Sequence, residues 1–208
     1  MNLINDLKWR YAIKLFDPSK KVSEENLEKI KEAIRLSPSS YGLQLYKIQI
    51  IEDLQLREKL KSFSYGQNQI TDASHLVVFC NYSVVTEEHI NEYFTLKSKI
   101  EQIDISEFKG YSDFIKADVN SKSKIEKDKW SSNQTYLALG NLLNACAELK
   151  IDACPMEGFE VEKYNEILGL SEQGLNTSVI ATIGYRSGND KTQHSKKIRK
   201  STQNLFIL

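Results

Sequence analysis

The chain has no excess of charge and no long apolar run. Its 208 residues include 28 basic and 28 acidic side chains, so the formal net charge is zero. A neutral chain gives no global reason to expect nucleic acid or an anionic membrane as a partner. No apolar run approaches the roughly 20 residues that span a bilayer, and charged residues near the start leave no room for a signal-peptide core. We therefore expect a cytoplasmic protein without a membrane partner.

Cysteine and histidine are scarce. The three cysteines, Cys80, Cys146 and Cys154, are widely spaced, form no Cys-x-x-Cys pair and have apolar neighbours, as expected of buried thiols in a reducing compartment. No cation or histidine lies near them in sequence, so a thiol nucleophile is not predicted. The three histidines lack metal-binding spacing, so no metal site is predicted. His75 is expected to be a hydrogen-bonded, partly buried side chain.

Linkers are also missing. No proline- or glycine-rich linker, internal repeat or low-complexity tract divides the sequence, so residues 1–208 are predicted to form a single domain. Charged residues 85–129, with scattered apolar positions, predict exposed helices that leave the core.

Periodicity predicts an α+β fold with about four core strands. Ser23 is a candidate N-cap before an apolar stripe at helical spacing, and Pro38 disfavours helical geometry at Ser37, so this helix is predicted to end at the serine loop. Apolar spacing over residues 132–149 predicts a central helix that is buried on most sides. Further strands are expected at 46–51, 76–80, 151–156 and 177–185, and further helices at 54–60 and 164–168.

Four polar motifs lie far apart in this sequence. They are Arg10 to Phe16, the loop Ser37 to Gln44, the turn Pro155-Met156-Glu157-Gly158-Phe159, and Lys196 to Lys200. Arg10 and Lys14 are four residues apart and would share one face of a helical turn. Each motif alone has an ordinary interpretation, such as a solvated basic pair or a serine turn that caps a helix. Their joint occurrence in this order is more specific.

Together these motifs resemble the FMN-dependent nitroreductase family, of the oxygen-insensitive NAD(P)H nitroreductase and dihydropteridine reductase type, over about residues 10–204. The resemblance implies a nitroreductase-like fold with a mostly antiparallel central sheet surrounded by helices. It also implies a homodimer that binds FMN between its subunits. The implied FMN-binding positions are Arg10, Tyr11, Ala12, Lys14, Ser39, Ser40, Gln67, Gln69, Pro155, Glu157, Gly158, Lys197 and Arg199. No residue is assigned as a protein nucleophile, because the flavin carries the chemistry.

Each chemical group of FMN needs a different kind of binding residue. Guanidinium groups suit a phosphate because they offer paired donors of fixed charge. We assign this role to Arg10 and Arg199, with Lys197 adding positive field. Ser39 and Ser40 could donate to phosphate or ribityl oxygens.

The ring of FMN would be tuned by Lys14, placed at its pyrimidine edge, where negative charge develops on reduction. At the Glu157–Gly158 turn the resemblance implies a backbone N–H directed at the reactive ring nitrogen, and glycine permits close approach. Close bacterial relatives carry a second lysine near the position of Gln69. The residue among 67–69 that touches the ring is left open.

The predicted activity is hydride transfer from NADH or NADPH, followed by reduction of a nitroaromatic, a quinone or a pterin in a ping-pong cycle. One alternative keeps the fold but assigns dehalogenation or flavin fragmentation. Another is a nucleic-acid module that uses residues 196–200, against which the neutral composition argues. The apolar tail after this basic segment is predicted to lie on the partner subunit, or else to form a strand within its own chain.

Overall fold

The computed structural model describes residues 2–207 and contains one four-stranded sheet. Its strand order is β1-β2-β4-β3, and all neighbouring strands are antiparallel. The strands are β1 (Tyr46–Ile51), β2 (His75–Tyr82), β3 (Asp152–Met156) and β4 (Leu175–Gly184). The predicted α+β class with a mostly antiparallel sheet is confirmed.

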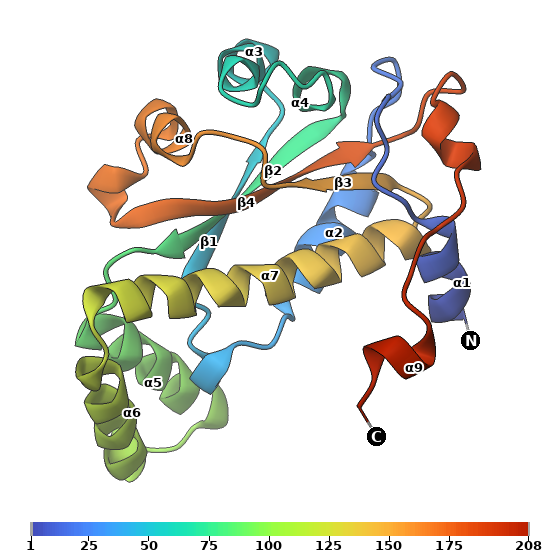
Figure 1. Cartoon of the computed structure of the whole chain (residues 1–208). Helices are drawn as coiled ribbons and strands as arrows, with labels where there is room; N and C mark the ends of the chain where they lie inside the picture. Colours follow the sequence, from blue (N-terminus) through green and yellow to red (C-terminus); the bar gives the residue numbers. More distant parts are fainter. Residues whose placement is uncertain (1, 208) are drawn as a thin grey trace.

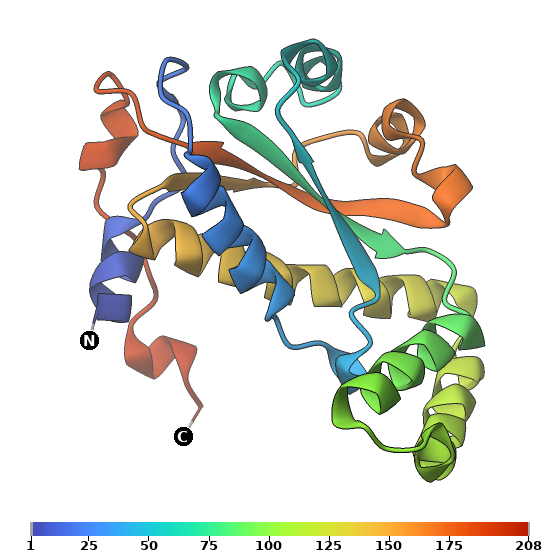
Figure 2. The same cartoon turned by 180° about the vertical axis from the view of Figure 1, so that it is seen from behind.

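Helices cover both faces of this sheet (Figures 1 and 2). Alternate residues of the central strand β2 point to opposite faces, as the period of a strand requires. Val77 and Phe79 join one buried cluster, and Leu76 and Val78 join the other. The helices are α2 (Glu24–Arg35) and α7 (Lys124–Glu148) on one face, and α3 (Leu54–Ser62), α4 (Gln69–Asp72) and α8 (Val161–Leu168) on the other.

Two helices, α5 (Glu87–Glu101) and α6 (Lys109–Ser121), project from one end of the molecule (Figure 1). They share a small apolar cluster that includes Phe94 and Ile115. The long helix α7 begins at Lys124 rather than at residue 132. Its start follows from the sequence, because Ser123 and Glu126 form a reciprocal capping box.

Helix α7 buries one face only, so the prediction that it is buried on most sides is wrong. Leu139 and Leu142 pack into the core, with 6% and 0% of their surface exposed. Tyr136 and Leu137 face away and are 42% and 47% exposed. Apolar residues lie on two faces of this helix, whereas the sheet covers only one of them. The spacing of apolar residues alone does not show whether a helix face is covered by the same chain or by another chain.

The two ends of the chain lie side by side near the end of α7 (Figure 1). Helix α1 (Asn2–Trp9) is joined to the segment after α7 by an ion pair between Asp6 and Lys150. Residues 195–207 run past α1 and include the short helix α9 (Thr202–Leu205). Among residues 2–207, no helix combines the length and apolar character needed to cross a membrane.

Candidate anion and cofactor site

Residues 10–16 are extended, so the expected helical turn that would align Arg10 with Lys14 is wrong. A parallel bridge joins Ala12 to Ala153 of β3, and an antiparallel bridge joins Phe16 to Arg186. These contacts take up the backbone groups that a helix would need for its own hydrogen bonds. The segment thus lies against the edge strand β3, and β3 leads into the Glu157–Gly158 turn.

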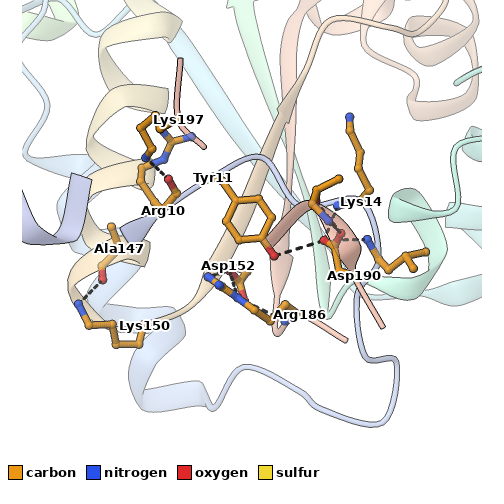
Figure 3. A network of polar contacts seen from close by, with 11 residues as sticks. Arg10, Tyr11, Lys14, Ala147, Lys150, Asp152, Arg186, Asp190 and Lys197 are labelled. Carbon is orange, nitrogen blue, oxygen red and sulfur yellow. Dashed lines mark hydrogen bonds and ion pairs between the residues drawn. The ribbon is translucent and has the colours of Figure 1, made fainter. Parts of the chain in front are cut away.

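A buried carboxylate holds this segment in place (Figure 3). Asp190 accepts hydrogen bonds from the backbone N–H of Lys14 at 2.9 Å and from the hydroxyl of Tyr11 at 3.3 Å. Burial raises the pKa of Asp190, but hydrogen bonds from Thr192 and from the backbone of Lys14 and Leu15 outweigh it, so the pKa is lowered. Figure 3 shows the Lys14 side chain directed away from this carboxylate. Asp190 therefore fixes the backbone of Lys14 and leaves its ammonium group available.

An ion pair between Arg186 and Asp152 supports the same segment. Arg186 donates to the buried Asp152 through Nε at 3.0 Å and through Nη2 at 2.5 Å. Its guanidinium carbon lies 4.5 Å from the ring centre of Trp9 and 4.6 Å from that of Tyr11. Such contacts are cation–π interactions. The pair and the two rings connect the end of α1 to strand β3.

The two ends of the chain bring three basic side chains together. Lys197 donates from Nζ to the backbone oxygen of Leu7 at 2.6 Å and also to that of Arg10. These carbonyls lie at the C-terminal end of α1, where a cation is favoured. Arg199 follows, lines the same cavity as Arg10, and its charge lowers the pKa of Arg10. A cavity of about 540 Å³ is lined by this cluster, by Tyr11 and Ala12, and by neighbouring residues 8–9, 192–193, 195–196 and 198.

This basic cluster has the positive charge that a phosphate needs, and one of its buried donors has no partner in the described chain. Burial, and then Arg199, lower the pKa of Arg10. Burial, and then Arg10 and Arg199, lower the pKa of Lys197. Over residues 2–207, no ion pair joins these three groups to a carboxylate, and Nε of Arg10 is buried without a hydrogen-bond partner. A bound anion would relieve the repulsion and satisfy that donor.

Lys14 and Gln69 meet at the thiol of Cys154. Burial raises the pKa of this thiol, and the nearby Lys14, Gln69 and Arg10 lower it only in part. Cations therefore do lie near Cys154 in space although none is close in sequence. The thiol remains protonated near neutral pH, with 2% of the residue exposed. All three cysteines are free and buried, in agreement with a packing role.

The Glu157–Gly158 turn is held from two sides. Tyr136 of α7 donates its hydroxyl to Oε1 of Glu157 at 2.6 Å. The amide nitrogen of Gln67 donates to the backbone oxygen of Gly158 at 2.9 Å and to that of Ser64 at 3.0 Å. Both amide hydrogens of Gln67 are thus engaged, and only its carbonyl oxygen could contact a ligand.

The turn itself presents two backbone donors. Within the described part of the chain, the N–H groups of Glu157 and Gly158 have no hydrogen-bond acceptor. Gly158 does not have a positive φ. A Cβ there would lie 3.2 Å from the amide nitrogen of Gln67 and 3.6 Å from the ring of Tyr65. Close packing against Gln67, rather than backbone conformation, therefore favours glycine at this position. Pro155 precedes this turn in β3, an edge strand that tolerates proline.

The serine loop lies elsewhere. Ser39 accepts a hydrogen bond from the backbone N–H of Gln44 at 2.9 Å, and the backbone N–H of Ser40 donates to Gln134 at 2.8 Å. Gln134 lies about 20 Å before the end of α7 at a rise of 1.5 Å per residue, whereas Arg10 follows α1 near that end. Figures 1 and 2 agree on this separation. One chain therefore groups residues 10–14, 67–69, 155–158, 197 and 199, but not Ser39 and Ser40.

Sequence reasoning missed the residues that support this site. Asp190, Asp152 and Arg186 lie outside the four motifs, and their partners are distant in sequence. Tyr136 was treated only as part of an apolar stripe. Gln134 accepts a hydrogen bond from the backbone N–H of Ser40. The sequence does not indicate this role, because a single glutamine within a helix forms no recognisable motif. His75 was interpreted correctly, since it is 4% exposed and bonds Ser74 at 2.9 Å.

The fold and the basic cluster define an α+β protein with a cleft lined by basic side chains, next to the segment that bridges the edge strand β3. Residues 7–185 match the sequence profile described as the nitroreductase family. The chain therefore belongs to the nitroreductase family.

A sequence relative supports this assignment, and two solved structures share the fold. A provisionally named NAD(P)H nitroreductase of Staphylococcus haemolyticus is 35% identical over 98% of this chain and 95% of its own length. A nitroreductase-like protein of Streptococcus mutans has a TM-score of 0.86 at 16% identity, over 100% of this chain and 98% of that one. A provisionally named nitroreductase of Exiguobacterium sibiricum, solved in complex with FMN, has a TM-score of 0.84 at 16% identity, over 100% and 97%.

Proposed function

We propose that the protein is an FMN-dependent oxidoreductase that uses NADH or NADPH to reduce a small-molecule acceptor. The observation that carries this proposal is the cluster of Arg10, Lys197 and Arg199, which has no carboxylate partner among the described residues. Arg10 of this cluster lies near Cys154 of β3, as Lys14 does. Relatives named NAD(P)H nitroreductases and a structural neighbour in complex with FMN support it. Nitroaromatics, quinones and pterins are the proposed acceptors.

The residues divide into three proposed roles. Arg10 and Arg199 bind the phosphate, with Lys197 supplying field and joining the tail to α1. Lys14 and Gln69, with Tyr11, Ala12 and Pro155, form the wall on which the flavin lies. The free backbone N–H groups of Glu157 and Gly158 face the reacting part of the ring. Bound FMN would supply hydride acceptance and electron transfer to the second substrate in a ping-pong cycle.

The purified protein tests this function directly. We expect a yellow solution with flavin absorbance, and loss of that absorbance on anaerobic addition of NADH or NADPH. A screen of both nicotinamides against a nitroaromatic, a quinone and a pterin then identifies the preferred pair. A colourless protein that neither binds added FMN nor oxidises either nicotinamide would reject the proposal, and a nucleic-acid module would behave in that way.

Lys14 is predicted to raise the potential of the bound flavin. Its ammonium group favours the negative charge that develops on reduction, and Gln69 supplies no second charge beside it. The Lys14→Met protein, reconstituted with FMN, should therefore have a lower two-electron potential, by on the order of 30 mV, which corresponds to about 1.4 kcal/mol. Spectroelectrochemical titration measures it. Unchanged potential in a variant that retains FMN would remove Lys14 from the ring.

We further propose that the protein is a homodimer in which the partner's Ser39–Ser40 loop completes the flavin site. The separation of this loop from Arg10 within one chain supports this arrangement. The exposed residues Tyr136 and Leu137 of α7 supply an apolar surface for the partner. The apolar tail is exposed too, with Phe206 at 58% and Ile207 at 104%.

Edge strand β1 offers a surface on which a partner's tail could lie. A cavity of about 530 Å³ lies over Ile34, Ile48 and Ile50 at this edge. The hydroxyl of Tyr46, which lines the same cavity, is buried without a hydrogen-bond partner. An edge strand also leaves backbone donors and acceptors free for pairing. The proposed tail exchange would cover all of these groups.

Removal of the tail tests the exchange. Deletion of residues 203–208 leaves Lys197 and Arg199 in place, so a loss of FMN cannot be ascribed to the basic cluster. We expect dimer and flavin to be lost together, because a ligand that contacts both chains stabilises their association by mass action. Light scattering and flavin content report the two losses. A truncated dimer with full flavin content would show that the tail packs elsewhere.

A further inference from the structure

The Glu157–Gly158 turn is held by side chains from two separate elements. The Tyr136 hydroxyl of α7 bonds the Glu157 carboxylate at 2.6 Å, within the range of charge-assisted O–H···O⁻ bonds. Burial, and then the hydrogen bond to Glu157, raise the pKa of Tyr136 to about 12, so the phenol remains a donor across the working pH range. The phenol therefore keeps the proton that it donates to the Glu157 carboxylate.

The opposite side of the turn is held by the loop between α3 and α4. Gln67 directs both amide hydrogens at backbone carbonyls, at 2.9 Å to Gly158 and at 3.0 Å to Ser64. Beyond the turn, the backbone N–H of Glu160 donates to the carbonyl of Phe63 at 2.8 Å. The peptide between Glu157 and Gly158 is thus fixed from both sides, while its N–H has no acceptor in the described chain.

We propose that Tyr136 and Gln67 are positioning residues that hold the backbone N–H groups of this turn as preorganised donors for the flavin ring. The inference rests on the proposed function. It gives Gln67 a role on the turn instead of on the ring. Preorganised donors assist a reaction because they need no reorientation as charge moves, and loss of such an aligned donor typically slows the chemical step strongly. Tyr136 and Gln67 act through the turn and do not contact the ring themselves, so their replacement is expected to slow the chemical step less.

A double-mutant cycle distinguishes positioning from general stabilisation. In Tyr136→Phe we expect FMN affinity within about twofold of wild type and anaerobic reduction by NADH slowed about tenfold, a step measured apart from acceptor turnover. Glu157→Ala should be slowed equally, and the double variant no further, because both changes remove one interaction. Glu157→Gln retains an acceptor for the phenol and should recover much of the rate. The matched control is Tyr111→Phe on α6, which removes a hydroxyl that has no hydrogen-bond partner among residues 2–207.

A readout independent of turnover is the ¹⁵N resonance of N5 in bound, isotopically enriched FMN. We expect it to shift in Tyr136→Phe and in Gln67→Leu, and to stay at the wild-type position in Tyr111→Phe. Additive rate losses in the cycle, or an unshifted resonance in both positioning variants, would overturn the inference. A wild-type protein without FMN would instead reject the proposed function, so the two failures are distinguishable.

Discussion

Replacement of Arg10 by alanine is expected to yield protein that purifies largely without flavin. Its guanidinium is partly buried, and its Nε has no hydrogen-bond partner within residues 2–207. Removal of one side of a desolvated charge pair costs about 2 to 4 kcal/mol, or roughly 30- to 1,000-fold in FMN affinity. Arg199 lies at an exposed position, so Arg199→Ala should fall at the lower end of that range. Fluorescence titration with FMN measures both losses.

Two controls make this result specific. Lys8 lines the same cavity without belonging to the cluster, and Lys8→Ala should change FMN affinity by less than about threefold, as for a solvated charge. Arg10→Lys retains the charge but loses the paired donors, and should bind with intermediate affinity. Full FMN occupancy in both alanine variants would reject phosphate binding by this cluster.

Replacement of Arg186 by alanine should be the most destabilising of the changes considered. The change leaves Asp152, whose side chain is only 3% exposed, without its cation. An uncompensated buried charge costs about 3 to 5 kcal/mol, and the contacts with the rings of Trp9 and Tyr11 are lost as well. Urea unfolding of the flavin-free protein at a fixed concentration measures the free energy of unfolding.

Replacement of the acidic partner, Asp152, is predicted to lower the free energy of unfolding less. Asp152→Ala leaves the Arg186 guanidinium, which is 23% exposed and can recover contact with water. Arg35→Ala removes an exposed pair with Glu32 and should cost no more than about 0.5 kcal/mol. If Arg186→Ala unfolded at the same urea concentration as Arg35→Ala, the buried pair would not hold α1 against β3.

The strands were predictable because their signals are local. The strand at 46–51 was placed at its observed bounds, and the helix after Ser23 begins where its cap predicts. The segment at residues 10–16 was not predictable. Its conformation depends on Asp190 and on a bridge to Ala153, and neither is visible from neighbouring residues.

The site was predictable to the extent that it consists of motifs. Arg10 and Arg199 line one cavity, and Gln67 bonds the backbone of Gly158. The resemblance supplied these positions but not the connections between them. A tyrosine at an exposed helical position looks the same in sequence whether it packs on a partner or bonds a glutamate. Tyr136 shows the difference only when α7 and the turn are seen together.

The hydrogen bonds from Lys197 to Leu7 and Arg10 join segments near the two ends of the chain. Almost every residue therefore lies within the loop that these bonds close. Closing a long loop carries an entropic cost that grows only slowly with its length. An anion bound between Arg10 and Arg199 would act as a non-covalent clasp across both termini. During synthesis, that clasp cannot form until residues 197–199 have left the ribosome. The anion would thus join a chain whose four strands are already made, and would connect residues 10 and 199 after them.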